Sequence, residues 1–117
     1  MIGGCTLNIS TVLKQGALIV RIDGEMDLNG TDQFRNTIDS ALENSQVKYL
    51  IISLKGVSFI DSSGVGVILG RYKKISAVGG KLLIANVKPQ VARILDVSGL
   101  LRIIKVFSSE SEALDSL

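Results

Sequence analysis

Histidine and tryptophan are absent from this 117-residue sequence, which contains one cysteine and one proline. Without histidine, a Ser-His-Asp triad, imidazole acid-base chemistry and histidine-ligated metal sites are excluded. The single cysteine, Cys5, excludes an intrachain disulfide and a cysteine-rich metal cluster. We therefore expect a protein that is not an enzyme and that holds neither a metal ion nor a cofactor.

The sequence also lacks a large net charge and long apolar runs. The 13 basic and 11 acidic residues give a formal net charge of +2, too small to attract nucleic acid by charge alone. The apolar runs are far shorter than the roughly 20 residues that a membrane span needs. The first four residues lack the basic and apolar regions of a signal peptide. These features predict a cytoplasmic protein without direct nucleic-acid or membrane partners.

The length and the remaining composition fit one compact domain covering residues 1–117. Hydrophobic residues make up 46% of the chain and charged residues 21%, which is ordinary for a globular protein and argues against disorder. Aromatic residues contribute only 4%, so the core must be built from Val, Ile and Leu.

Hydrophobic periodicity predicts five strands and four helices. The expected strands are Thr6–Leu13, Ala17–Ile22, Tyr49–Leu54, Lys81–Ala85 and Ile103–Val106. Apolar stripes at helical spacing predict helices over 31–44, from the region of Val65 to 79–80, from Pro89 to Gly99 and from Ser109 onward. Polar loops are expected over 24–30 and 56–66.

The predicted order is therefore ββαβαβαβα, an α/β fold. The first two strands form an N-terminal hairpin, and strands then alternate with helices. That alternation predicts a mixed, largely parallel sheet covered by helices. In such sheets, functional loops follow the carboxyl ends of strands.

The loop after the third strand has the most suggestive composition, with Asp61, Ser62 and Ser63 at the start of a helix. One interpretation is a helix cap, because Asp and Ser are the residues that caps use. The other is a functional site with an accessible hydroxyl. The residues here and around Gly80 do not match the spacing of a dinucleotide fingerprint, a P-loop or a nucleophile elbow.

Gly66 and Gly70 lie one helical turn apart and give this helix a strip without side chains. Either the glycines let the helix pack closely on the sheet, or the backbone of another protein approaches there. Sequence alone leaves both interpretations open.

The segment from Asp61 to Lys73, DSSGVGVILGRYK, resembles the signature of bacterial anti-sigma-factor antagonists, the single-domain STAS proteins. Two further segments, 24–27 (GEMD) and 97–100 (VSGL), resemble family motifs in the same order along the chain. The resemblance covers essentially the whole sequence and implies a STAS fold.

The resemblance also implies a partner-switching function. An anti-sigma factor that is itself a serine kinase would bind the unmodified protein, which frees the sigma factor to engage RNA polymerase. Phosphorylation of Ser62 would then release the protein, and a serine/threonine phosphatase would reset it; Ser63 is the alternative acceptor. The implied partner-binding residues are Asp27, Asp61, Ser62, Ser63, Gly64 and Gly66.

Three alternative functions fit the sequence less well. A scaffold subunit of a stress-signalling assembly usually joins this module to a sensory domain, for which 117 residues leave no space. A lipid-transport accessory subunit would not need the full Asp-Ser-Ser-Gly motif. A small nucleotide-binding or hydrolytic enzyme is disfavoured by the missing histidine and the failed phosphate-loop spacing.

Overall fold

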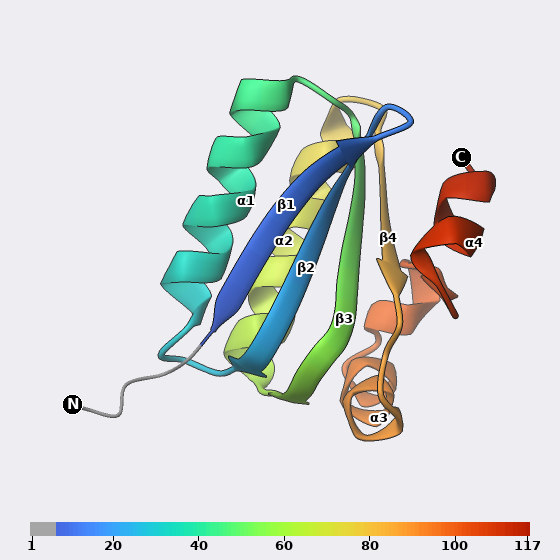
Figure 1. Cartoon of the computed structure of the whole chain (residues 1–117). Helices are drawn as coiled ribbons and strands as arrows, with labels where there is room; N and C mark the ends of the chain where they lie inside the picture. Colours follow the sequence, from blue (N-terminus) through green and yellow to red (C-terminus); the bar gives the residue numbers. More distant parts are fainter. Residues whose placement is uncertain (1–6) are drawn as a thin grey trace.

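The computed structural model describes residues 7–117, which form a five-stranded sheet with helices on both faces (Figure 1). The strands are β1 (Asn8–Lys14), β2 (Ala17–Met26), β3 (Tyr49–Ile60), β4 (Lys81–Ala85) and β5 (Val106–Phe107). The helices are α1 (Thr31–Ser45), α2 (Ser62–Ala77), α3 (Pro89–Val97), the 3-10 turn η1 (Leu100–Arg102) and α4 (Glu110–Asp115). Within residues 7–117, none of these helices has the length and apolar character of a membrane span.

The predicted α/β class and element order are confirmed, with η1 as an addition. The strands lie side by side in the order β1-β2-β3-β4-β5; β1 is antiparallel to β2, and every later pair is parallel. Gln15 and Gly16 turn the hairpin with φ of 53° and 79°, the left-handed values that a type I′ turn requires. Cys5 and the expected first strand residue, Thr6, lie outside the described residues.

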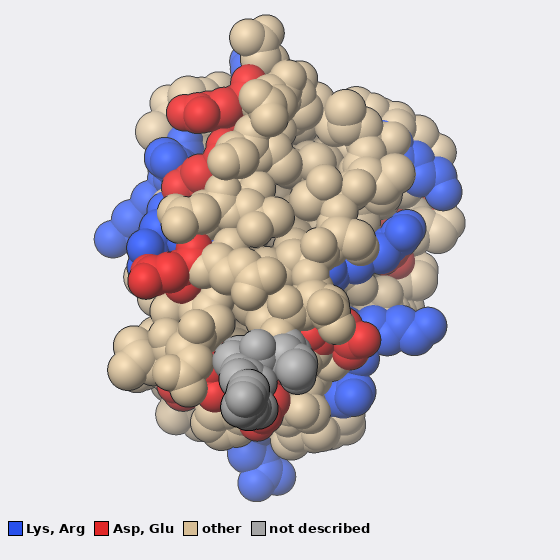
Figure 2. All heavy atoms as spheres, turned by 60° about the vertical axis from the view of Figure 1, so that its left-hand side comes forward, with Lys and Arg blue, Asp and Glu red and all other residues tan. Residues whose placement is uncertain are grey.

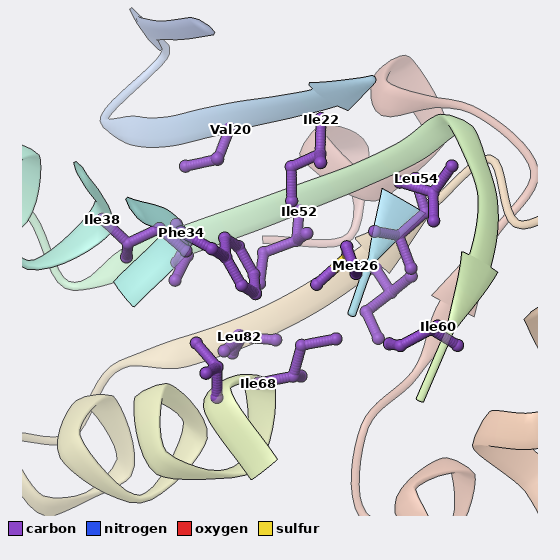
Figure 3. Close-up of a cluster of buried hydrophobic side chains, with 14 of the residues drawn as sticks. Val20, Ile22, Met26, Phe34, Ile38, Ile52, Leu54, Ile60, Ile68 and Leu82 are labelled. Carbon is purple, nitrogen blue, oxygen red and sulfur yellow. The ribbon is translucent and has the colours of Figure 1, made fainter. Parts of the chain in front are cut away.

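The main core lies between the sheet and helices α1, α2 and α3. It consists almost entirely of Ile, Leu and Val, as the low aromatic content predicted, with one fully buried ring, that of Phe34. Figure 3 shows side chains from the sheet and from both long helices meeting in this layer. Complete burial of residues such as Ile52, Ile68 and Leu54 supplies the apolar contribution that holds α2 in place.

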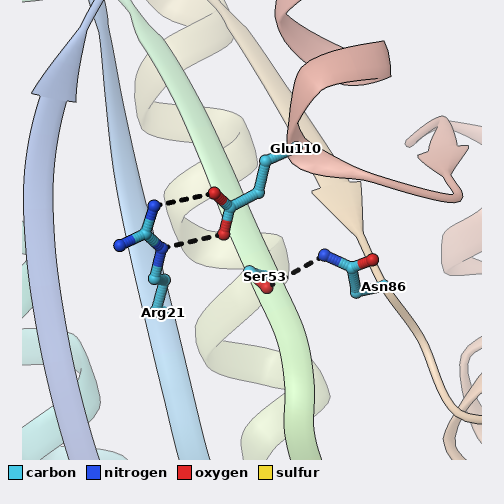
Figure 4. A network of polar contacts seen from close by, with 4 residues as sticks. All are labelled: Arg21, Ser53, Asn86 and Glu110. Atoms are coloured by element: carbon cyan, nitrogen blue, oxygen red, sulfur yellow. Dashed lines mark hydrogen bonds and ion pairs between the residues drawn. The ribbon is translucent and has the colours of Figure 1, made fainter.

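The opposite face of the sheet is covered in part by α4. Ala113 and Leu114 pack on a second cluster of buried residues that includes Ile19 and Ile51. Glu110, the first residue of α4, accepts two hydrogen bonds of 2.9 Å from the Arg21 guanidinium on β2 (Figure 4). These hydrogen bonds keep the pKa of Glu110 below its usual value.

Helices α1 and α2 are linked by charged side chains. Arg71 Nε on α2 lies 3.2 Å from Asp39 Oδ1 on α1, and Lys74 Nζ lies 3.3 Å from Asp39 Oδ2. Arg71 is 9% exposed, so its charge is largely withdrawn from water. Asp39 therefore supplies the counter-charge that a buried guanidinium needs.

Four predicted boundaries are wrong, and one of them is the start of α2, which begins at Ser62 although residues 62–66 were expected to belong to the loop. Residues 24–26 continue β2 and residues 56–60 continue β3, although both segments were expected to be loops. Parallel pairing overrides their polar and glycine-rich composition, with Gly24 opposite Val57 and Met26 opposite Ile60. The last strand is Val106–Phe107, not 103–106, because Ile103 and Ile104 close the turn that follows η1.

Candidate functional site

The candidate site lies where β3 ends and α2 begins. The Asp61 amide donates a hydrogen bond of 3.2 Å to the carbonyl of Met26, the last residue of β2. Asp27 follows Met26 directly. Asp27 and Asp61, the two aspartates of the predicted site, therefore lie in adjoining segments at the end of the sheet where β2 and β3 terminate. This arrangement follows from the parallel pairing of β2 with β3, which brings both carboxyl ends together.

Asp61 is the N-cap of α2. Its Oδ1 accepts hydrogen bonds from the amides of Ser63 at 2.9 Å and Gly64 at 3.2 Å, and from the Ser63 hydroxyl. The Ser63 hydroxyl is the main reason that the pKa of Asp61 lies below its ordinary value, and backbone amides, including that of Leu28, lower it further. The capping interpretation of Asp61 is confirmed.

The two neighbouring serines have different environments. Ser62 is the first residue of α2 and is exposed, whereas Ser63 is half-buried. The Ser63 hydroxyl donates to Asp61, but the Ser62 hydroxyl has no hydrogen-bond partner among residues 7–117. The cap and the accessible hydroxyl, which sequence presented as competing interpretations, are therefore divided between different residues of one turn.

The glycines of this helix also have different surroundings. A Cβ atom on Gly64 would lie 2.7 Å from the Met26 carbonyl oxygen and 2.8 Å from Ile60 Cγ1, so Gly64 is needed for close packing of α2 on the strands. Gly66 and Gly70 have nothing within 4 Å of such an atom. Close packing on the sheet is therefore the wrong interpretation for these two, and their strip faces open space.

Asp27 shapes the loop between β2 and α1. Its Oδ1 accepts from the Asn29 amide at 3.0 Å, and its carbonyl accepts from the Gly30 amide at 3.0 Å. The turn leaves Leu28 74% exposed, and its backbone amide is one of the groups that lower the pKa of Asp61. Asp27 thus fixes a loop that adjoins the start of α2.

A hollow of about 330 Å³ lies between the start of α2 and helix α3. Its lining residues are Ser62, Val65, Arg93, Ile94, Val97 and Ser98. Val97, one of these lining residues, is 84% exposed and so is accessible to a partner. Sequence reasoning gave the α3 residues no role, although the VSGL motif at 97–100 marked their position.

The site is suited to binding another protein. Leu28, Phe59 and Val97 are exposed large apolar side chains around it, the kind that anchor protein interfaces. Phe59 is 42% exposed and comes two residues before Asp61. Within residues 7–117, no cluster of three or more acidic or cysteine side chains could hold a metal ion.

Comparison with known proteins gives a consistent result. Residues 8–113 match the family model described as the STAS domain. The anti-sigma F factor antagonist of Paenibacillus polymyxa is 43% identical over 111 residues, which is 95% of each chain.

Two solved structures carry the same fold. The anti-sigma factor antagonist SpoIIAA in its unphosphorylated form is 31% identical over 95% of each chain, with a TM-score of 0.80. The Bacillus cell fate determinant SpoIIAA in its phosphorylated form is 30% identical, with a TM-score of 0.72 over 95% of this chain and 98% of that one.

Proposed function

This chain belongs to the STAS-domain family and to its anti-sigma-factor antagonists, and on that premise we propose that Ser62 is its regulatory phosphorylation site. The protein is a regulatory binding protein, not an enzyme. Its proposed partner is an anti-sigma factor with serine kinase activity, which binds the surface around Ser62 and thereby releases a sigma factor to RNA polymerase in the cytoplasm. A phosphatase then resets the modified protein.

The observation that carries the proposal is the difference between the two serine hydroxyls. A kinase must bring the acceptor oxygen in line with the γ-phosphate of ATP. This requires a hydroxyl that is accessible and is not held in place by a hydrogen bond. The Ser62 hydroxyl is exposed and unbonded among the described residues, whereas that of Ser63 is held by Asp61. SpoIIAA, to which this chain is similar, has been solved in an unphosphorylated and in a phosphorylated form, which supports phosphorylation as the means of regulation.

The proposed partner surface combines several elements. Around Ser62 it includes Asp27, Asp61, Ser63 and the first turn of α2. In that turn the Ser63 and Gly64 amides donate to the Asp61 carboxylate. Open space at Gly66 lets a partner backbone approach the helix. The hollow with Val97 and Arg93 on α3 extends this surface and supplies an apolar contact next to the acceptor.

Phosphate on Ser62 would act at the interface. It adds about −1.5 to −2 charges at neutral pH, at the rim of an apolar hollow and beside the Asp61 carboxylate. A partner that covers the hollow would desolvate this charge. A cost of about 3 kcal/mol weakens binding about a hundredfold, which is enough to release the partner.

The test is phosphorylation by the cognate anti-sigma kinase and ATP, followed by intact-mass measurement and peptide mapping. We expect one phosphate on Ser62 in the wild type and in Ser63→Ala, and none in Ser62→Ala. Ser62→Ala should still bind the kinase, since only the acceptor oxygen is lost. Phosphate on Ser63, or an unmodified wild-type protein that binds the kinase, would contradict the proposal.

A further inference from the structure

The hollow between α2 and α3 brings a cation beside the proposed phosphate acceptor. Ser62 and Val65 line it from one face of α2, and Arg93 and Val97 line it from one face of α3. Among the described residues of this lining, Arg93 alone is charged. With a volume of about 330 Å³, the hollow is near the lower limit of small-molecule pockets, so a long side chain on one wall reaches the other.

The Arg93 guanidinium has no partner in the unmodified protein. Arg93 is exposed, and among residues 7–117 its side chain forms neither an ion pair nor a hydrogen bond. Its neighbours in the hollow, Val65 and Val97, offer a surface to the aliphatic stem but no acceptor to the guanidinium. The charged end of the side chain is therefore available to a new anion.

Other basic side chains already have counter-charges. Figure 2 shows acidic and basic side chains alternating along one margin of the molecule. The ion pairs within residues 7–117 join Arg21 to Glu110, Arg35 to Asp32, and both Arg71 and Lys74 to Asp39. Arg93 differs from these cations because its charge is uncompensated next to Ser62.

Phosphate on Ser62 would need a counter-charge. The neighbouring Asp61 carboxylate is held in its charged form by the Ser63 and Gly64 amides, so it repels the phosphate. These amides are then occupied and do not bind the new group. An arginine guanidinium suits a phosphate well, because its planar fork donates two parallel hydrogen bonds.

We propose that Arg93 is the internal counter-charge of phosphorylated Ser62, and that its guanidinium donates hydrogen bonds to the phosphate across the hollow. The proposal rests on the proposed function, in which Ser62 carries the phosphate. In this position the aliphatic stem of Arg93 lies over Val65 and Val97. Phosphorylation thus adds charge and also covers the apolar contact that the unmodified protein offers to its partner.

The test uses the full chain with phosphoserine inserted at position 62 during translation, so that no kinase is needed. Phosphorus NMR follows the second ionisation of the phosphate, whose ordinary pKa is about 6. Pairing with a cation favours the dianion, so we expect Arg93→Ala to raise this pKa by about 0.5 pH units or more. Arg93→Lys should restore part of the difference, because it keeps the charge but not the fork.

Arg102→Ala is the matched control. Arg102 is exposed, has no ion pair among the described residues and lies outside the hollow, so its loss removes the same charge. We expect this variant to titrate like the wild type. Nuclear Overhauser contacts between the Arg93 methylenes and the Val65 methyl groups should also strengthen on phosphorylation.

Equal titration midpoints in the wild type and Arg93→Ala would overturn the proposal, and so would an equal rise in Arg102→Ala. Unchanged contacts between Arg93 and Val65 would overturn the covering of the hollow. Circular dichroism checks the fold of each variant; if Arg93→Ala does not fold, Arg93→Gln decides, because it keeps much of the stem without the charge. Failure of the proposed function is separate, since it would appear as kinase modification of Ser63 or of neither serine.

Discussion

Asp61 stabilises helix α2 and lies next to Ser62, the proposed phosphate acceptor. Its carboxylate caps α2 through the amides of Ser63 and Gly64. Replacing an N-cap by alanine typically costs about 1 kcal/mol, so we expect Asp61→Ala to lower the free energy of unfolding by that amount. Asp61→Asn should retain most of the stability, because asparagine also caps helices well. Urea unfolding at pH 7 provides the measurement.

The same residue predicts a pH dependence. Because folding lowers the pKa of Asp61, its contribution is fully present above the unfolded value near 3.8 and is lost as the pH falls through the folded value. The stability advantage of wild type over Asp61→Ala should therefore shrink in acid. An asparagine at position 61 does not titrate in this range. The difference in unfolding free energy between Asp61→Asn and Asp61→Ala should therefore stay constant as the pH falls. An advantage of wild type that persists below both pKa values would contradict this.

Gly64 and Gly66 form a matched pair on one helix. Gly64→Ala places a methyl group against the Met26 carbonyl and Ile60, and we expect destabilisation of about 1–3 kcal/mol. Gly66→Ala meets open space and should stabilise the helix by about 0.5–1 kcal/mol. If a partner backbone approaches Gly66, the same variant binds the kinase more weakly. Thermal unfolding and calorimetric titration with the kinase separate the two effects.

At the residue scale, sequence reasoning selected the residues of the candidate site but did not resolve their contacts. The DSSG segment and Asp27 were found because their composition and motif resemblance are local. Which serine is held and which is free depends on a side-chain hydrogen bond that no pattern encodes. The open space at Gly66 and Gly70 likewise depends on what other elements leave uncovered.

At the scale of elements, helix α3 is the part of the proposed surface that sequence reasoning missed. We expect Val97→Asp to weaken kinase binding at least about tenfold, because it puts a charge in the apolar hollow. Val78→Asp is the matched control, since Val78 is 59% exposed at the opposite end of α2. Equal losses for both variants in calorimetric titration would exclude a specific role for α3.

The packing of α1 on α2 makes a second prediction at this scale. Asp39→Ala leaves the Arg71 guanidinium buried without its counter-charge, and we expect a loss of about 1–2 kcal/mol in unfolding free energy. Asp32→Ala removes an exposed ion pair with Arg35 and should cost no more than about 0.5 kcal/mol. Urea unfolding of both variants side by side gives the comparison, and similar losses would refute the distinction.

Element type was more predictable than element length. The four α-helices and the first four strands were recognised from their sequence patterns, chiefly the apolar positions that record which face an element buries, whereas η1 was not expected. The extensions of β2 to Met26 and β3 to Ile60 could not be read this way, because glycine and polar residues there pair with a neighbouring strand. Two-residue β5 was misplaced because Ile104 fills the core from a turn.

At the scale of the whole molecule, the account requires phosphorylation to change binding without changing the fold. A dianion at the first residue of α2 interacts favourably with the helix dipole, by about 0.3–1 kcal/mol. The Ser62-phosphorylated protein should therefore unfold at the same temperature as the unmodified protein, or slightly higher. Circular dichroism melting of the two purified forms checks this, and a marked loss of helical signal on phosphorylation would contradict it.

The most direct test of the central claim is the affinity of the anti-sigma kinase for the unmodified and the Ser62-phosphorylated protein, measured by calorimetry under identical conditions. The account predicts binding about a hundredfold weaker for the phosphorylated form, with the same circular dichroism spectrum for both. Equal affinities would show that phosphate on Ser62 does not control partner release, and a refolded α2 in the phosphorylated protein would refute a local electrostatic switch.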